Sequence, residues 1–228
     1  MNKKRLGILA GMGPRSTGPF LESVYDECQR QYHAVNDIDY PEIVIYSWPT
    51  PFYVNRPVDD AALSAAIKRG LIELSKADVS VIAMPCNTAH KYFKELEQCV
   101  GVKLLNIIDI AAGRLDESSK KVTVFGTEST MNMGIYQDAV RKRGKEFCYD
   151  EEWQEEINKL IMRIKSKDDY SKIAADYQKL ENRAVNAGVD TIIFACTDLS
   201  VISSEDRKTA VIDSSKELAV ELIKEYSA

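Results

Sequence analysis

Short apolar runs of strand length alternate along the chain with longer amphipathic stretches. Strands alternating with helix-length amphipathic patterns are typical of an α/β fold with a mainly parallel sheet. The predicted strands are residues 6–10, 43–47, 79–84, 104–107, 122–125, 191–195 and 210–212. The predicted helices are residues 17–32, 59–77, 87–100, 132–143, 152–165, 170–187 and 214–226.

A weak internal repeat is the second feature of this pattern. Residues 77–88 align with residues 187–198. In both segments a helix ends at an alanine, a buried strand follows, and then a cysteine, Cys86 in one copy and Cys196 in the other. Each copy is preceded by a strand that runs into a glycine turn and is followed by a strand that ends in aspartate, Asp109 or Asp213. The repeat predicts two similar halves.

The two halves are expected to form pseudo-symmetric, three-layer α/β domains with the active site in the interdomain cleft. The boundary is expected near residues 113–119, where a glycine and a charged, serine-containing stretch interrupt the pattern. The N-terminal domain then comprises residues 1–113 and the C-terminal domain residues 114–213. The last helix, within residues 214–228, can pack on either half and is assigned to the first.

Composition and charge exclude several classes of protein. The chain has 228 residues, of which 45% are hydrophobic and 29% charged, so it can bury a core and is not intrinsically disordered. The formal net charge of -5 argues against a surface that binds nucleic acid or an anionic membrane. No segment approaches the ~20 apolar residues that a membrane span needs.

The N-terminus and the cysteines indicate the compartment. Basic residues precede an apolar run, as in a signal peptide, but Gly11 breaks that run too soon. The five cysteines are an odd set without paired spacing, so a disulfide framework is not expected. We therefore expect a protein of the reducing cytoplasm.

Cys86 and Cys196 are the candidate reactive groups. Ligands of open α/β sheets bind beyond the carboxyl ends of the strands, and both cysteines fall there, each before a predicted helix. A helix N-terminus stabilises a thiolate through its partial positive charge and free N–H groups. A lone cysteine at a strand end is more often a small buried hydrophobe, but two at matching positions of a repeat favour a function. Cys28, Cys99 and Cys148 lack this context and are predicted to be structural.

Three motifs carry a resemblance to a known family. The chain reads GILAGMGPRST at residues 7–17, MPCNTAH at residues 84–90 and ACTD at residues 195–198. These segments resemble the motifs of the aspartate/glutamate racemase family. Residues 126–130 and 134–136 also match the loop of its second half, so the resemblance covers essentially the whole chain.

The resemblance implies an enzyme that racemises amino acids without pyridoxal phosphate, metal or any other cofactor. Members of the family are two-domain, pseudo-symmetric proteins with one cysteine on each face of the α-carbon, so Cys86 and Cys196 are the expected catalytic pair. Inversion needs a base on one face and an acid on the other, with the roles exchanged in reverse, which two like thiols satisfy. The partner is then a small-molecule amino acid, and a homodimer is expected.

The same resemblance implies which residues bind the substrate. Those expected to hold its α-carboxylate or α-amino group are Asn87, Thr88, Thr127, Thr130 and Thr197. Further substrate-binding candidates are Met12, Gly13 and Thr50. Backbone N–H groups and hydroxyls of this set can stabilise the carbanion that forms when the α-proton leaves. Asp198 stands where many members have glutamate, and it is expected to orient Cys196 or the substrate ammonium.

Specificity is expected to depend on the loop of residues 48–57, which is aromatic and stiffened by prolines. Aspartate-specific members of the family place a basic residue in this loop and a lysine in the second half to hold the side-chain carboxylate. Here Arg56 is the cation of the loop, with Lys165 or Lys167 as second-half candidates. The chain is most similar to the broad-specificity amino-acid racemases of the family, so we expect several side chains to be accepted.

Other functions compete with this interpretation. Residues 11–13 suggest a dinucleotide loop, but Ser16 replaces the third glycine of that motif. Cys86, His90 and Cys196 could together ligate zinc. Decarboxylation or cis-trans isomerisation of a small dicarboxylate is an alternative reaction, and a non-catalytic amino-acid-binding protein is an alternative of another class. The two cysteines favour the racemase, because a one-base decarboxylase or a binding protein does not need both thiols.

Overall fold

The computed structural model describes residues 4–53, 56–202 and 208–228, and the chain divides into two compact units. Unit 1 comprises Met1–Ile107 and Lys216–Ala228, and unit 2 comprises Ile108–Ser215. The division falls earlier than the expected boundary near residue 113. The reason is a short helix, α4 (Ile107–Ala112), nearly all of which belongs to unit 2.

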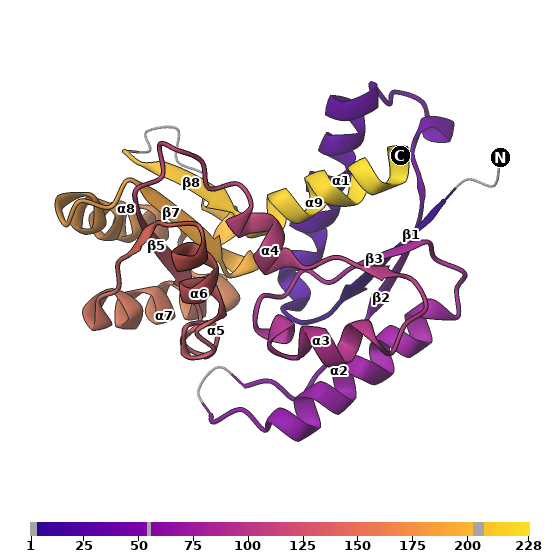
Figure 1. The fold of residues 1–228 in the computed structure, drawn as a ribbon, viewed down its shortest axis with the longest axis horizontal. Helices are drawn as coiled ribbons and strands as arrows, with labels where there is room; N and C mark the ends of the chain where they lie inside the picture. Colours follow the sequence, from indigo (N-terminus) through magenta and orange to yellow (C-terminus); the bar gives the residue numbers. More distant parts are fainter. Residues whose placement is uncertain (1–3, 54–55, 203–207) are drawn as a thin grey trace. The chain divides into compact units, whose positions relative to one another are not determined.

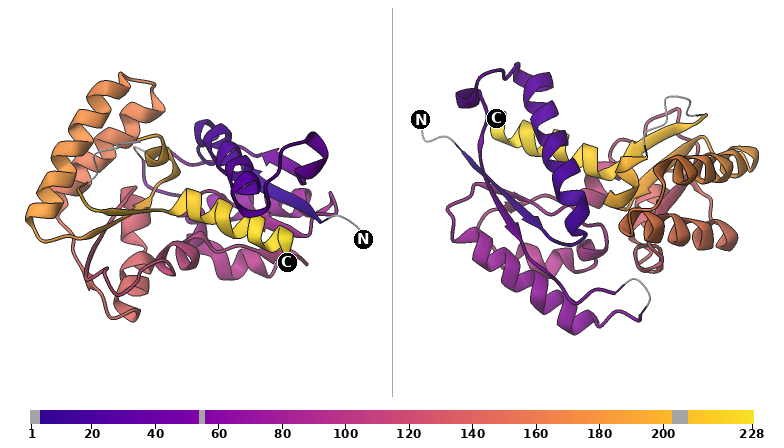
Figure 2. Two further views of the ribbon diagram at one scale, coloured as in Figure 1. Left: turned by 90° about the horizontal axis from the view of Figure 1, so that it is seen from above. Right: turned by 180° about the vertical axis from the view of Figure 1, so that it is seen from behind.

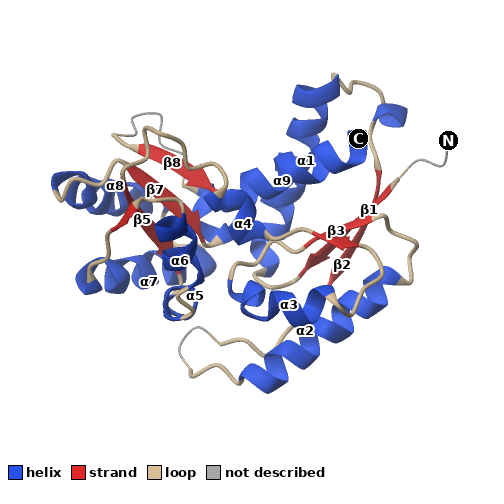
Figure 3. Cartoon of the chain, viewed as in Figure 1, coloured by secondary structure: helices blue, strands red, loops and turns tan. Residues whose placement is uncertain are grey.

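Unit 1 contains a parallel sheet of four strands in the order β2-β1-β3-β4 (Figure 1). The strands are β1 (Arg5–Ala10), β2 (Glu42–Ser47), β3 (Val81–Ala83) and β4 (Lys103–Leu104). The helices are α1 (Thr17–Tyr32), α2 (Asp60–Ser75), α3 (Phe93–Glu97) and most of α9 (Ser214–Ser227). Three 3-10 helices join them, η1 (Pro14–Ser16), η2 (Asp37–Asp39) and η3 (Thr88–Tyr92). Figure 3 shows α2 and α3 on one side of this sheet and α1 and α9 on the other.

Helix α2 forms much of the core of unit 1. It begins where the Asp59 carboxylate accepts a hydrogen bond from the Ala62 N–H at 3.0 Å, as an N-cap residue does. Its buried apolar residues recur every three or four positions, at Leu63, Ile67, Leu71 and Leu74. Their spacing makes one apolar stripe, which packs against Leu9 and Ile82 of the sheet.

Helix α9 packs alongside α1 (Figure 2). Its fully buried apolar residues are Leu218, Ala219, Leu222 and Ile223. The Gln31 amide donates to the Val220 carbonyl at 2.9 Å, and the Lys4 ammonium donates to the Glu225 carbonyl at 2.8 Å. These contacts join the C-terminal helix to the first helix and to the residue that precedes the first strand.

Unit 2 contains a second parallel sheet of four strands, in the order β6-β5-β7-β8. The strands are β5 (Lys121–Gly126), β6 (Glu146–Phe147), β7 (Thr191–Ala195) and β8 (Ala210–Asp213). The helices besides α4 are α5 (Glu128–Asn132), α6 (Ile135–Lys142), α7 (Glu151–Lys165) and α8 (Tyr170–Asn186), with the 3-10 helix η4 (Thr197–Val201).

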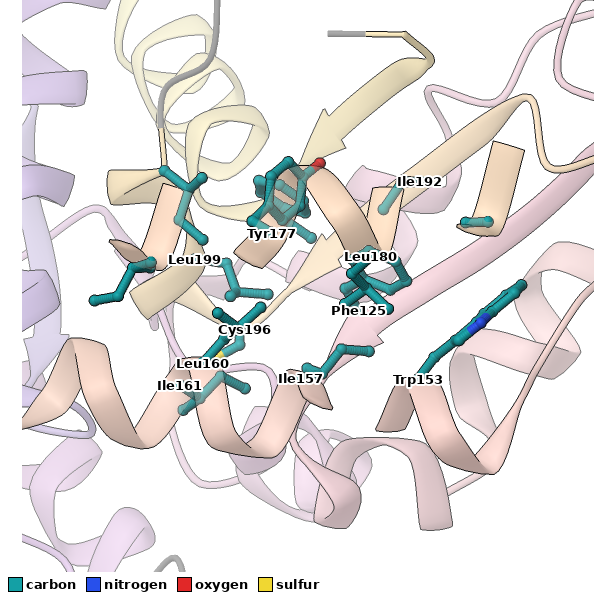
Figure 4. Packing of buried hydrophobic residues seen from close by; sticks show 14 of the residues in the cluster. Phe125, Trp153, Ile157, Leu160, Ile161, Tyr177, Leu180, Ile192, Cys196 and Leu199 are labelled. Carbon is teal, nitrogen blue, oxygen red and sulfur yellow. The ribbon is translucent and has the colours of Figure 1, made fainter. Parts of the chain in front are cut away.

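The core of unit 2 lies between its sheet and the pair α7 and α8 (Figure 4). Helix α7 contributes Trp153, Ile157, Leu160, Ile161 and Ile164. The Tyr177 ring of α8 meets Phe125 and Phe194 of the sheet edge-on, with ring centroids 6.4 and 5.6 Å apart. Edge-to-face packing of aromatic rings stabilises such a core beyond the area it buries. Cys196 belongs to this cluster, so its side chain packs against the hydrophobic core of unit 2.

The α/β class with parallel sheets is confirmed. The two sheets have the same strand order, with β1, β2, β3 and β4 corresponding to β5, β6, β7 and β8. The internal repeat in the sequence therefore corresponds to β3 and β7 with the turns that follow them. Strand β6 was not predicted, because two residues carry no periodicity, although the repeat requires a counterpart of β2 at that place.

Three predicted elements differ from the structure. The strand expected at residues 104–107 is only Lys103–Leu104, and Asp109 lies in α4 rather than at a strand end. The helix expected at residues 87–100 is the 3-10 helix η3 followed by α3. The helix expected at residues 132–143 is preceded by the unpredicted α5 and begins only at Ile135, because Gly134 has a φ of 71° and separates the two helices.

His90 connects the end of β3 to the turn after β4. Its ring is buried, with Nδ1 2.8 Å from the Cys86 carbonyl oxygen, and Nε2 accepts a hydrogen bond from the Ile107 N–H at 3.2 Å. Nε2 also lies 3.2 Å from the Leu105 carbonyl oxygen. A neutral ring with its proton on Nδ1 satisfies both Cys86 and Ile107, whereas a proton on Nε2 would serve only Leu105. The geometry therefore favours the Nδ1–H tautomer.

Gly11 allows β1 and β2 to approach closely at their carboxyl ends. The Trp48 N–H donates to the Ala10 carbonyl at 3.0 Å, which extends the pairing beyond the strands. Gly11 has a φ of 94°, and a Cβ at this position would lie 2.6 Å from the backbone N and O of Trp48. No side chain fits there without separating the two segments.

The Gly11→Ala variant should therefore be less stable by about 3 kcal/mol or more. The substitution adds the strain of a positive φ to a steric clash that breaks a backbone hydrogen bond. Urea unfolding followed by circular dichroism measures the loss. Gly18→Ala is the matched control, because Gly18 is exposed in the first turn of α1 with open space around it, and its change should stay within ~1 kcal/mol. Equal stabilities of the two variants would contradict the close approach.

The tautomer of His90 is a second expected outcome. Nitrogen-15 spectra near neutral pH should give His90 the shift pattern of a neutral ring protonated at Nδ1. The chain has two histidines, so the spectrum of a His33→Gln variant assigns the signals. A His90 ring protonated at Nε2 would be incompatible with the bond to Cys86.

Candidate active site

The carboxyl edge of the unit 1 sheet gathers most of the residues predicted in the first half. Strands β1, β2 and β3 are parallel neighbours, so they end at the same edge. The segments that leave them there contain Met12 and Gly13 after β1, Thr50 after β2, and Cys86, Asn87 and Thr88 after β3. Met12 and Cys86 both pack against the core cluster of this unit. We call these residues the unit 1 half-site.

Cys86 lies in a tight turn after β3. Its N–H donates to the Met84 carbonyl at 2.8 Å, and its own carbonyl lies against His90. The thiol residue is half-buried, whereas Asn87 and Thr88 are buried. The helix that follows is a 3-10 helix of five residues rather than the long α-helix expected, so a helix macrodipole contributes little to this thiol.

The carboxyl edge of the unit 2 sheet gathers the residues predicted in the second half. Cys196 directly follows β7 and is 8% exposed, and the next residue, Thr197, is also buried. After β5, the Thr127 hydroxyl oxygen accepts the Thr130 N–H at 3.2 Å, and the two hydroxyl oxygens are 3.0 Å apart. Cys196 too is followed by a 3-10 helix of five residues, η4, so the predicted helix N-terminus is again short. We call this group the unit 2 half-site.

A partly buried ion pair borders Cys196. The Lys165 Nζ, at the end of α7, lies 2.6 Å from Oδ2 of Asp198 in the first turn of η4. The Cys196 thiol donates to the same oxygen at 3.7 Å. The sequence indicated Lys165 and Asp198 separately, one as a cation for the substrate and one as a group that orients Cys196. Their direct contact was not predicted, because the two residues come from different elements.

The remaining specificity candidates are more exposed. Arg56 is exposed, with its guanidinium carbon 4.7 Å from the centroid of the Tyr53 ring. Residues 54 and 55 of the same loop lie outside the described residues. Lys167 is exposed beyond the end of α7 and has a φ of 57°. Of the two second-half lysines, Lys165 is therefore the one that reaches the unit 2 half-site.

The other cysteines have no comparable surroundings. Burial raises the pKa of the Cys28 thiol, and it also raises the pKa of the Cys148 thiol. Cys99 lies in the turn after α3, and its thiol donates to the Glu95 carbonyl of that helix at 3.1 Å. A raised pKa leaves little thiolate at neutral pH, so Cys28 and Cys148 are poorly suited to acid/base chemistry.

Two further observations concern metal binding and membrane spans. Within the residues that the structure describes, no group of three or more His, Cys, Asp and Glu side chains is arranged to hold a metal ion. His90 of the hypothetical zinc set directs its two ring nitrogens at backbone groups. None of the described helices combines the length and apolar character needed to cross a membrane.

Comparison with known proteins agrees with the motifs. A family model described as Asp/Glu/Hydantoin racemase matches residues 9–222. The broad specificity amino-acid racemase RacX of Bacillus subtilis (strain 168) is 42% identical to this chain over 224 residues, which cover 98% of each protein.

Solved structures give the same result. The aspartate racemase of Picrophilus torridus is 31% identical, with a TM-score of 0.84 over 98% of this chain and 94% of that one. An aspartate racemase homologue from Pyrococcus horikoshii is 26% identical, with a TM-score of 0.78 over 99% of this chain and 100% of that one. The resemblance seen in the motifs is thereby confirmed along nearly the whole length, and the chain belongs to the Asp/Glu/hydantoin racemase family.

Proposed function

We propose that the protein is an amino-acid racemase that inverts the α-carbon by proton transfer between Cys86 and Cys196, without a cofactor. The observation that carries the proposal is the equivalent placement of the two thiols, each just after the third strand of a repeated sheet. The 42% identity to a broad specificity amino-acid racemase supports the reaction class.

The chemistry of racemisation accounts for two like groups. One thiolate removes the α-proton from one face, and the thiol on the other face returns a proton to the carbanion. In the reverse direction the roles exchange, so neither group can be a permanent acid or a permanent base. The mechanism requires that the two half-sites share one substrate molecule.

The carbanion needs fixed hydrogen-bond donors around the substrate carboxylate, since an α-proton is far less acidic than a thiol. In unit 1 the proposed donors are the backbone N–H groups around Gly13 and the buried residues Asn87 and Thr88. In unit 2 the Thr127 and Thr130 hydroxyls, 3.0 Å apart, form a small polar cluster at the end of β5. These groups are proposed to hold the α-carboxylate and the α-amino group.

We further propose that the enzyme accepts several side chains. Lys165 contacts Asp198, and Arg56 is exposed beside Tyr53, so neither of these two candidate cations is already positioned to hold a side-chain carboxylate. A carboxylate bound in a partly dry site without such partners would be costly.

Replacing either thiol tests the mechanism. Cys86→Ala and Cys196→Ala should each lower racemisation by about 10²- to 10⁴-fold, because either change removes half of an obligatory acid/base pair. Each variant should still exchange the α-proton of one enantiomer with D2O, and the two should prefer opposite enantiomers. Chiral chromatography with mass spectrometry of the α-position measures both. Cys99→Ala is the matched control and should keep the full rate, because this thiol belongs to neither half-site and donates to the Glu95 carbonyl of α3.

Several results would reject this assignment. Either variant with the full rate, or both variants exchanging the same enantiomer, would contradict one cysteine on each face. Consumption of the substrate with release of CO2 would favour a decarboxylase. Tight binding of amino acids without exchange or inversion would favour a binding protein.

A substrate panel tests the specificity. Across a set of L-amino acids, the kcat/KM values for several neutral side chains should lie within ~100-fold of the value for aspartate, a difference of about 2.7 kcal/mol in transition-state stabilisation. Arg56→Gln should change the aspartate and neutral rates alike, since the guanidinium lies over Tyr53. A kcat/KM for aspartate more than ~100-fold above that for every other amino acid would refute broad specificity.

A further inference from the structure

The charges beside Cys196 are arranged around one oxygen atom. Oδ2 of Asp198 accepts the Cys196 S–H at 3.7 Å and contacts the Lys165 ammonium at 2.6 Å. The Asp198 side chain is 4% exposed and the Lys165 side chain 27% exposed. Thiol, carboxylate and ammonium thus form a chain that runs from the buried end of β7 towards solvent.

A carboxylate in this position creates an electrostatic problem. A negative charge within ~4–6 Å disfavours a second one, so Asp198 alone would oppose ionisation of the thiol it orients. The surroundings sharpen the effect, because Cys196 packs among Leu160, Ile161 and Leu199 (Figure 4). In such an apolar setting charges are weakly screened.

The other titratable groups of the unit come from elements around the same core. Besides Asp198 on η4 and Lys165 on α7, the buried titratable side chains in the described part of unit 2 are Tyr136 on α6, Tyr177 and Glu181 on α8, and Asp213 on β8. Asp213 accepts hydrogen bonds from the Ser200 hydroxyl at 2.9 Å and the Ser215 N–H at 3.0 Å. The Lys165 ammonium contacts the same Asp198 oxygen that accepts the hydrogen bond from the Cys196 thiol.

We propose that Lys165 is a positioning residue for Cys196: its ammonium neutralises Asp198, so that this carboxylate orients the S–H without opposing thiolate formation. When Cys196 gives its proton to the substrate carbon, Asp198 stays ionised and Lys165 stays protonated. The summed charge of Cys196, Asp198 and Lys165 then changes from zero to one negative charge. Without the Lys165 ammonium it would change from one negative charge to two. This inference rests on the proposed function in treating Cys196 as an acid/base group, and it assigns Lys165 to Asp198 rather than to the substrate side chain.

The test measures the thiolate directly. Iodoacetamide alkylates thiolates, and mass spectrometry of peptides gives the rate for each cysteine as a function of pH. The pH at which the alkylation rate of a cysteine reaches half its maximum is its midpoint. In Lys165→Met the midpoint for Cys196 should rise by about 1–3 pH units, because an uncompensated carboxylate faces the thiol. In Asp198→Asn it should fall, because the cation alone favours the thiolate. Lys165→Arg should stay close to the parent, and the double variant Lys165→Met/Asp198→Asn should return towards it.

The pH midpoint for Cys86 alkylation in the same samples is the internal control for the fold and should move much less than the Cys196 midpoint. A Lys165→Met midpoint equal to that of the parent, or a double variant displaced as far as Lys165→Met, would overturn the proposal. If Lys165→Met does not fold, Asp198→Asn is compared with the double variant, since these two differ only at residue 165. Equal Cys196 midpoints in those two variants would also overturn the proposal. The assay needs no turnover, so an inactive protein with the expected shifts would reject the racemase and keep the inference.

Discussion

The parallel pairing of β1 with β3, and of β5 with β7, is the constraint on which both half-sites depend. Parallel neighbours end at the same edge of a sheet, so the residues that follow one strand lie beside those that follow the next. Gly126 indicates how close they come, since a Cβ there would lie 3.1 Å from the Ala195 carbonyl oxygen. A one-residue slip of either pair would turn the buried side chains of a strand to its other face and displace the cysteine after it.

Both half-sites contain buried polar groups, and these are stable because each has a partner. In unit 1 His90 bonds to the Cys86 carbonyl and to the Ile107 N–H. In unit 2 Thr127 caps α5 through the Thr130 N–H, and Asp198 contacts Lys165. Such bonds fix side-chain and backbone positions before any substrate arrives, which is what electrostatic stabilisation of a carbanion requires.

The two units are alike in backbone order but differ around their thiols. Cys86 is half-buried and lies in a turn held by a histidine, whereas Cys196 is buried beside a carboxylate and an ammonium. A repeat preserves where a strand ends, because hydrogen-bonded pairing depends on backbone geometry. It does not preserve the charges around that end, since these come from side chains of other elements. In the mechanism that we propose, acid and base roles would therefore be exchanged between two thiols in unlike environments.

The sequence by itself determined the α/β class, the repeat, the family and the two strand-end cysteines. Those features are local. Helix α1 has the bounds that the apolar period predicts, Thr17–Tyr32. Cys196 directly follows β7, and Cys86 follows β3 after Met84 and Pro85. Only the tertiary structure decided the two-residue β6, the turn into α4 after β4, and the meeting of Lys165 with Asp198. The reason is that pairing at a sheet edge and contact between α7 and η4 depend on packing across distant segments, which no local period encodes.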